Sequence, residues 1–174
     1  FHGTDHTLTV NISSDEAFAS PFRQIDGAVI MNLAVDGTVT SSAYHASGLV
    51  GNCGSDNPNI VHNCAVAVAV SGAPYAGGIV GHGGHGTLTI EDCVFDGTIS
   101  GFANYAGGIL GWCDALTLQI DNCLTTGTFA PTGSGKYHPI ACKYAIETVF
   151  ATVDRAYSLN TITPTKTGDQ LLTC

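Results

Sequence analysis

The sequence predicts an all-β fold, a parallel β-helix or β-solenoid of about four coils of about 30 residues each. Two motifs that recur at one common interval are the main observation behind this prediction, and β-strand patterning inside each repeat is the second. We expect a single domain over residues 1–174, with a lead-in or cap at 1–25, the repeats at 26–135, and a degenerate repeat with a C-terminal cap at 136–174.

The first motif is a glycine, two aliphatic residues and a second glycine. Its copies begin at Gly48, Gly78 and Gly108, at intervals of 30 residues. The second motif is Asn or Asp followed by a short, mostly apolar run, and its copies begin at Asn32, Asn63, Asp92 and Asn122. Two independent motifs that keep one period indicate a structural repeat.

Inside each repeat the pattern is that of β-strands. Residues 87–90 and 116–120 alternate apolar and polar side chains, and Thr and Ile suit a pleated strand. Gly and Asn recur at fixed offsets, as corners with unusual backbone angles require. Short strands in repeats of this length favour coils stacked about 4.8 Å apart. A propeller blade would need about 40 residues.

The composition limits the classes of partner. Charged residues make up only 11% of the chain, which disfavours a coiled coil, and recurring apolar residues disfavour disorder. The net charge of −9 disfavours binding to nucleic acid, because a phosphate backbone requires a basic surface. No apolar stretch approaches the length of a membrane span, so we expect no membrane insertion.

The glycine motifs at 48–51, 78–81 and 108–111, together with Asn63-Cys64 and Asn122-Cys123, resemble the GLUG repeat family. This resemblance covers about residues 25 to 130 well. It implies a β-solenoid, an extracellular or cell-surface location in bacteria, and no catalytic residues that could be carried over. The sequence departs from the pattern at Pro139 and Cys142, which puts the geometry of the last coil in doubt.

Three of the seven cysteines, Cys64, Cys93 and Cys123, fall in one column of the repeat. They could form a disulfide staple or serve as small buried apolar residues. Leu33 occupies the same column in the first repeat, and parallel side chains in register point the same way. We therefore predict that the three thiols are buried and reduced.

The segment 81–86 matches the glycine pattern of dinucleotide-binding loops, but a strand pattern follows it where a helix would be required. We therefore predict a flexible turn there. His82 and His85, with Asp114 from the next repeat, could ligate a metal ion. Because no ligand-spacing motif supports a metal site, we expect no metal and no cofactor.

Aromatic residues supply the remaining candidates for ligand contact. Tyr75 and Tyr105 share a column, as either a sugar-stacking platform or a structural ladder. Trp112 is the only tryptophan and follows a glycine corner, which makes it the strongest candidate. The candidate ligand-binding residues are therefore Trp112, Asp114, His82 and His85.

Glu91 and Asp121 share another column, about one strand spacing apart. Paired carboxylates at this distance could imitate a retaining glycosidase, and many polysaccharide-cleaving enzymes are β-helices. Fold-level analogy is weak evidence, and an exposed, solvated pair is the commoner arrangement. The sequence also contains no nucleophile elbow, so we expect no catalytic residues.

We expect a non-catalytic structural or adhesive module of a bacterial extracellular or cell-surface protein. It would act as a spacer, a display scaffold or a self-associating subunit. The alternatives are a carbohydrate-binding module and a polysaccharide-active β-helix enzyme. The expected partner is protein, either further repeats of a parent chain or copies of this chain, with a glycan as a further possibility.

Overall fold

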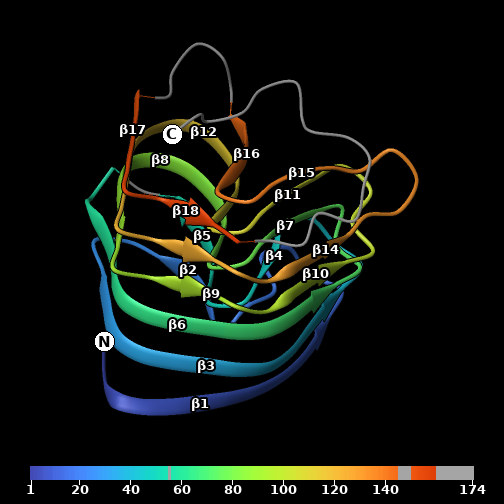
Figure 1. The fold of residues 1–174 in the computed structure, drawn as a ribbon, viewed down its shortest axis with the longest axis horizontal. Helices are drawn as coiled ribbons and strands as arrows, with labels where there is room; N and C mark the ends of the chain where they lie inside the picture. Colours follow the sequence, from blue (N-terminus) through green and yellow to red (C-terminus); the bar gives the residue numbers. More distant parts are fainter. Residues whose placement is uncertain (55, 145–149, 160–174) are drawn as a thin grey trace.

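A computed structural model describes residues 1–54, 56–144 and 150–159 of the chain. Within these residues the fold is all-β, with parallel strand pairing throughout and no helix. The chain winds into a β-solenoid of about five turns, which confirms the fold class and comes close to the four coils expected. Figure 1 shows β1, β3, β6 and β9 stacked upward in sequence order.

Each turn of the solenoid has three faces. Face A is built by β2 (Phe22–Ile25), β5 (Val50–Gly54), β8 (Val80–Glu91), β12 (Leu110–Asp121), β16 (Ala141–Tyr144) and β17 (Phe150–Asp154). Face B is built by β1 (His2–Ser14), β9 (Val94–Phe95), β10 (Thr98–Ser100), β13 (Leu124–Thr125), β14 (Thr128–Ala130) and β18 (Tyr157–Ser158). Face C is built by β4 (Ala46–Ser47), β7 (Tyr75–Gly77), β11 (Tyr105–Gly107) and β15 (Lys136–His138). Two long strands, β3 (Val29–Ser41) and β6 (Asn59–Ser71), run from face A into face B.

The segment 1–25 contributes a coil of its own. β1 pairs in parallel with β3 at His2 and, after a register shift, from His6 to Ser14, with Leu8 opposite Val35 and Ile12 opposite Val39. A further strand, β2, pairs with β5. This coil extends the solenoid below the expected repeats. The cap expected near the C-terminus lies partly in residues 160–174, outside the described residues.

The corner between faces A and B is a column of Asn and Asp residues in the left-handed backbone region. The φ angles are 55° at Asn32, 49° at Asn63, 54° at Asp92 and 50° at Asn122. Asn and Asp tolerate this region better than other non-glycine residues, which explains the second sequence motif. The column is also bonded along the solenoid axis, because the Asn63 amide nitrogen donates to the Asn32 amide oxygen at 2.7 Å.

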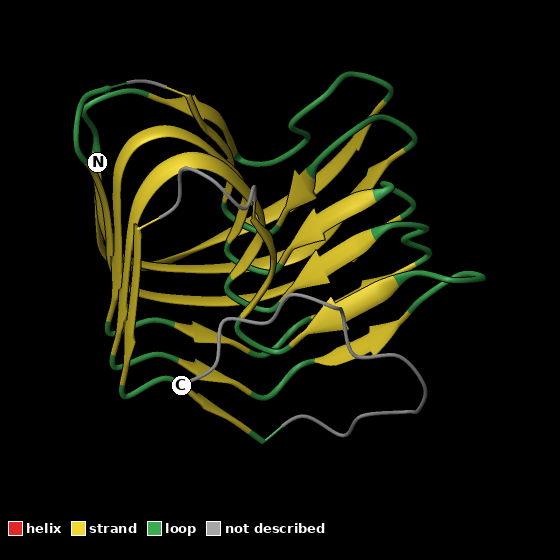
Figure 2. Ribbon diagram, turned by 90° about the horizontal axis from the view of Figure 1, so that it is seen from above, coloured by secondary structure: helices red, strands yellow, loops and turns green. Residues whose placement is uncertain are grey.

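The corner between faces C and A requires glycine because the chain there lies against the inner side of face B. A Cβ atom added at Gly78 would lie 2.1 Å from the carbonyl oxygen of Gly108 and 2.5 Å from Cγ of Phe95. One added at Gly108 would lie 2.0 Å from the carbonyl oxygen of Pro139. The chain therefore turns inward at each glycine motif, and Figure 2 shows from above that the backbone bends inward between faces A and C. We term this inward bend of the backbone the notch.

The interior is filled by columns of apolar side chains, as the repeat predicts. Leu49, Ile79 and Ile109 are all 0% exposed, which confirms the predicted core column. Cys64, Cys93 and Cys123 are buried too, and the six described cysteines are free thiols. Each thiol of the column lies against a carbonyl oxygen two residues earlier, at 3.3 Å for Cys64 and His62. The cysteines thus serve the corner as weak hydrogen-bond donors.

The prediction of a flexible turn at the glycine-rich segment 81–86 is wrong. The segment lies inside the continuous strand β8. The neighbouring strands explain this difference: β8 pairs with β12 along its length and with β5 on its other edge. Ladder pairing from both sides holds His82, Gly83 and His85 in the sheet although the composition favours a turn, and at Gly86 the backbone leaves the extended region with a φ of 76°.

Candidate functional site

Two outward-facing columns meet in the notch between faces A and C. On face A, register places Asn52 beside His82 and His82 beside Trp112. On face C, Tyr75 stands beside Tyr105. Seven rings gather here and form what we term the aromatic cluster: Phe18, Tyr44, His45, Tyr75, His82, Tyr105 and Trp112.

The rings of the aromatic cluster contact one another across the notch and along the axis. The centroids of His45 and His82, from opposite walls, lie 4.5 Å apart. Trp112 meets Tyr75 edge to face at 4.9 Å and Tyr105 at 5.4 Å. These separations lie within the range in which aromatic pairs attract each other. The notch is thus closed by side chains that stabilise its two walls against each other.

Asp114 is the charged centre of the site. Its Oδ2 atom lies 3.0 Å from Nε2 of His82, and its Oδ1 atom accepts a hydrogen bond from the Trp112 indole at 2.7 Å. Partial burial would raise the pKa of the Asp114 carboxyl, but the hydrogen bonds from His82 and Trp112 outweigh burial and lower that pKa. Nδ1 of His82 lies 2.8 Å from Oδ1 of Asn52, so the hydrogen bonds span three coils.

His45 is an uncharged ring in this environment. Burial, and next the charge of His82, lower its pKa to about 4, although Asp114 acts in the opposite direction. Its Nδ1 atom is shielded from solvent and has no hydrogen-bond partner. The ring stacks on Tyr75 with centroids 5.0 Å apart. His45 therefore acts as an aromatic spacer between Phe18 and Tyr75.

The stacking favours one of the two interpretations of the tyrosine column. Tyr75 is stacked on Tyr105 at 6.0 Å and on His45, so neighbouring side chains occupy both of its faces. A sugar ring needs a free aromatic face, so this arrangement favours a structural ladder. Tyr44, at one end of the cluster, is 60% exposed.

The structure brings together three of the four candidate ligand residues. His82, Asp114 and Trp112 are joined by hydrogen bonds, whereas His85 stands in register with Ala115 and its side chain is exposed. Within the described residues, no group of three His, Cys, Asp or Glu side chains is arranged to hold a metal ion. The metal ligand set His82, His85 and Asp114 is therefore not assembled.

The carboxylate column lies at the corner between faces A and B. Glu91 and Asp121 are neighbours in register, as expected. Each carboxylate has a cationic or ionisable neighbour: Nδ1 of His62 lies 3.3 Å from Glu91, and the Arg155 guanidinium donates to both oxygens of Asp121. The hydrogen bonds from Arg155 lower the pKa of Asp121. Both carboxylates thus contribute to contacts between coils.

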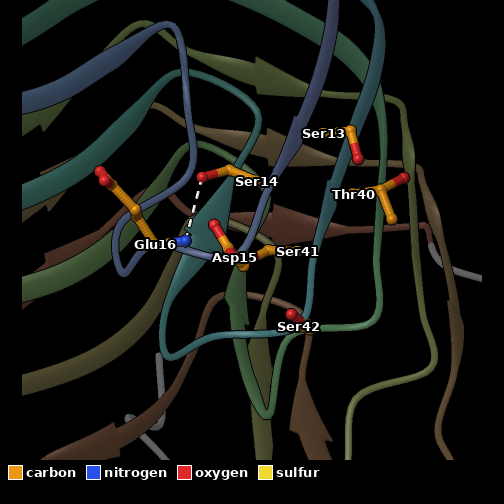
Figure 3. Close-up of a pocket in the computed structure, with 7 residues that line it drawn as sticks. All are labelled: Ser13, Ser14, Asp15, Glu16, Thr40, Ser41 and Ser42. Atoms are coloured by element: carbon orange, nitrogen blue, oxygen red, sulfur yellow. Dashed lines mark hydrogen bonds between the residues drawn. The ribbon is translucent and has the colours of Figure 1, made fainter.

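A hollow of about 530 Å³ lies at the end of β1. Figure 3 shows its lining of small polar and acidic residues, Ser13, Ser14, Asp15, Glu16, Thr40, Ser41 and Ser42. Oγ of Ser14 accepts a hydrogen bond from the Glu16 amide at 3.1 Å, and Glu16 pairs with Arg23. The lining of this hollow contains four serines and two carboxylates but no histidine.

Sequence reasoning identified the two columns of the notch but not their contact, and it missed Phe18. A usable signal was present: His45 and Asn52, Tyr75 and His82, and Tyr105 and Trp112 are each separated by the same interval, with a glycine corner between them. An inward corner turns the residues before it and after it towards each other on the outside. Phe18 belongs to the non-repetitive first coil and carries no such signal.

The chain matches no family description, no curated protein and no solved structure. In the part of the chain that the structure describes, no helix has the length and apolar character needed to cross a bilayer.

Proposed function

We propose that this chain is a non-catalytic structural or adhesive module that acts as a rigid spacer or display scaffold. One observation carries the proposal: the carboxylates that could act in catalysis or ligand binding are hydrogen-bonded to residues of the adjacent coils. Asp114 is held by His82 of the coil below, and Asp121 by Arg155 of the coil above. Such contacts stiffen a stack of coils.

Catalysis would require the opposite arrangement. A general acid or nucleophile must be within reach of a substrate atom and paired with a group that tunes it. The thiols of Cys53, Cys64, Cys93, Cys113, Cys123 and Cys142 are buried in the core, away from any substrate. Glu91, one of the two carboxylates considered for glycoside hydrolysis, lies 3.3 Å from Nδ1 of His62 at the corner. These contacts support a stabilising role for the polar side chains.

We place the module at the bacterial cell surface or outside the cell. The support is the resemblance of the glycine motifs to GLUG repeats, together with an acidic surface that would keep a solenoid apart from nucleic acid. Membership of that family is part of the proposal.

A polysaccharide degradation screen, run with wild-type protein and Glu91→Gln, tests the proposal. We expect no turnover by either protein. Release of sugars by the wild type that Glu91→Gln abolishes would replace the proposal with a glycosidase. The screen is paired with thermal unfolding, in which Trp112→Ala lowers the midpoint because it removes contacts to Tyr75, Tyr105 and Asp114.

Glycan binding is a second candidate, favoured by one specific hollow. A cavity of about 130 Å³ is lined by Ala103, Asn104, Tyr105, Ser134 and Lys136. It combines one aromatic ring with amide, hydroxyl and ammonium groups, the side-chain types that recognise sugars. A glycan array tests it: binding by the wild type should be lost in Asn104→Ala and kept in Tyr44→Ala, and an array without signal excludes it.

A further inference from the structure

The notch holds two histidines whose surroundings differ. The rings of His45 and His82 approach each other from opposite walls, with centroids 4.5 Å apart. His82 has an oxygen atom opposite each ring nitrogen: Oδ1 of Asn52 lies 2.8 Å from Nδ1, and Oδ2 of Asp114 lies 3.0 Å from Nε2. A doubly protonated imidazole can donate to both oxygens, whereas a neutral one can donate to only one. The site of His82 therefore accommodates a positive charge.

The site of His45 does not accommodate a positive charge. Its Nδ1 atom is shielded from solvent and has no hydrogen-bond partner among the described residues. Protonation would place an N–H group there without an acceptor, which costs free energy. Burial, and next the charge of His82, accordingly lower the pKa of His45 to about 4. The notch thus holds one imidazolium but not two.

The other groups that face His45 do not compensate for a second charge. Three rings that carry no charge in acid contact it, those of Phe18, Tyr44 and Tyr75. Two charged groups act on it from face A: His82 on β8 lowers the pKa of His45, and Asp114 on β12 raises it. Burial and His82 together outweigh the carboxylate, so the ring stays neutral until the solution is distinctly acidic.

The repeat indicates that this position does not need a histidine for packing. Strand β4 pairs with β7 and β7 with β11, so His45 corresponds to Tyr75 and Tyr105 in the next two coils. Tyrosine at those two positions continues the ladder of stacked rings and does not titrate below pH 7. The coil that contains His45 therefore differs from the next two by carrying a ring that can bind a proton in mild acid.

We infer that the notch is an acid-sensitive latch, which is closed while His45 is neutral and opens when this ring binds a proton. A charged His45 repels the imidazolium of His82 and moves towards water, which can accept from both of its N–H groups. That movement withdraws the ring that separates Phe18 from Tyr75. The two walls then part on the outside, while the strands of the solenoid stay paired. The inference is independent of the proposed function.

The pH range of the latch follows from the two states of His45. Its pKa is about 4 in the closed notch, and it returns to the ordinary value of 6.5 when the ring is solvated. As the pH falls below about 6.5, proton binding favours the open state, and this effect ends near pH 4, where the closed state binds the proton too. From pH 7 to pH 4.5 the ratio of open to closed notch should rise about 50-fold. Asp114 stays charged over this range, because its pKa is below 3.8.

Solvent exchange of the Trp112 indole proton, followed by NMR, tests the latch. Asp114 holds this proton at a donor–acceptor distance of 2.7 Å, and the chain contains one tryptophan, so its signal is unambiguous. Wild type and His45→Tyr are compared at equal pH, which cancels the intrinsic exchange rate. The rate of the wild type relative to the variant should rise about 50-fold from pH 7 to pH 4.5. His85→Tyr, at an exposed ring of β8, is the matched control and should behave as the wild type does.

Backbone amides of β6 separate a local latch from loss of the whole fold. Their exchange in the wild type relative to His45→Tyr should not change with pH. The same 50-fold change in β6 would mean that acid unfolds the entire solenoid, and a pH-independent ratio for the Trp112 indole would mean that His45 does not control the notch. Either result overturns the inference. If His45→Tyr does not fold, His45→Phe takes its place, because phenylalanine likewise binds no proton.

Discussion

Nε2 of His82 lies 3.0 Å from Oδ2 of Asp114, and this contact joins β8 to β12 across the outside of the notch. The carboxylate is held a second time by the indole of Trp112, two residues before it in the chain. One side chain therefore fixes both the spacing of two coils and the orientation of the largest ring in the notch.

Replacing Asp114 by Asn should lower the free energy of unfolding at neutral pH by about 1 kcal/mol, because charge-assisted hydrogen bonds become neutral ones in a partly exposed site. The folded-state pKa of Asp114 is below its ordinary value of 3.8. Its stabilising effect is therefore present above about pH 4 and lost as the pH falls through the folded-state pKa. Urea unfolding at neutral and acidic pH should show the difference between wild type and Asp114→Asn shrinking in acid. Asp56→Asn, at an exposed turn, removes the same charge and should show neither effect.

Substitution of Gly78 by Ala should destabilise the protein by about 3 kcal/mol or more, because the added methyl would overlap the Gly108 carbonyl and the Phe95 ring. Gly133→Ala is the control, because it introduces backbone strain without a steric clash. Gly133 has a φ of 60° and open space around its Cβ position, so only the strain of about 1 kcal/mol remains. Equal unfolding midpoints for the two variants would contradict the close approach at the glycine corner.

At the corner between faces A and B, Asn63→Ala should lower the free energy of unfolding by about 2 kcal/mol. It loses the hydrogen bond to Asn32 and places a residue with no local polar group at a φ of 49°. Asn63→Gly loses the same hydrogen bond, but glycine adopts a positive φ without strain. This variant should therefore lower the free energy of unfolding by about half as much. Chemical denaturation of both variants measures the two contributions, and a glycine variant less stable than the alanine variant would argue against this account.

The thiols should be unreactive in the folded protein. Burial raises the pKa of both Cys53 and Cys113 to about 12, which leaves a negligible thiolate fraction at pH 8. In a Cys174→Ser background, which removes the one cysteine outside the described residues, an aromatic disulfide reagent should label the native protein only at its rate of unfolding. Six thiols should then react in denaturant. Rapid labelling without denaturant would contradict the buried columns.

The repeat made much of this fold predictable. Gly78 and Gly108 set the period of 30 residues, which predicts that Ile79 stacks on Ile109. The same period predicts that Asn52, His82 and Trp112 form one column. The first coil was harder to predict, because β1 lies against β3 with an offset that includes a register shift between His2 and His6. Local composition misled at residues 81–86, where pairing on both edges overrides the turn preference of glycine.

The meeting of the two aromatic columns could not be predicted from periodicity. Period alone shows that Tyr75 and Tyr105 stack, but their contact with Trp112 depends on the direction in which the glycine corner bends. That direction is set by the space between Gly78 and Phe95, which is a property of the packed interior. The candidate site therefore became visible only in three dimensions.

The in-register glycine corners make the height of the solenoid adjustable in whole coils. Residues 78–107 begin and end at equivalent points of the repeat, so their removal would join Gly77 to Gly108 and restore the same Gly-Gly-aliphatic corner. Asn52 would then stand beside Trp112, and the core columns would continue without a break. Insertion of a second copy of this segment would lengthen the stack by the same logic. A lineage that carries such a chain can thus change the reach of the module through duplication or loss of a short stretch of gene, without redesigning any interface.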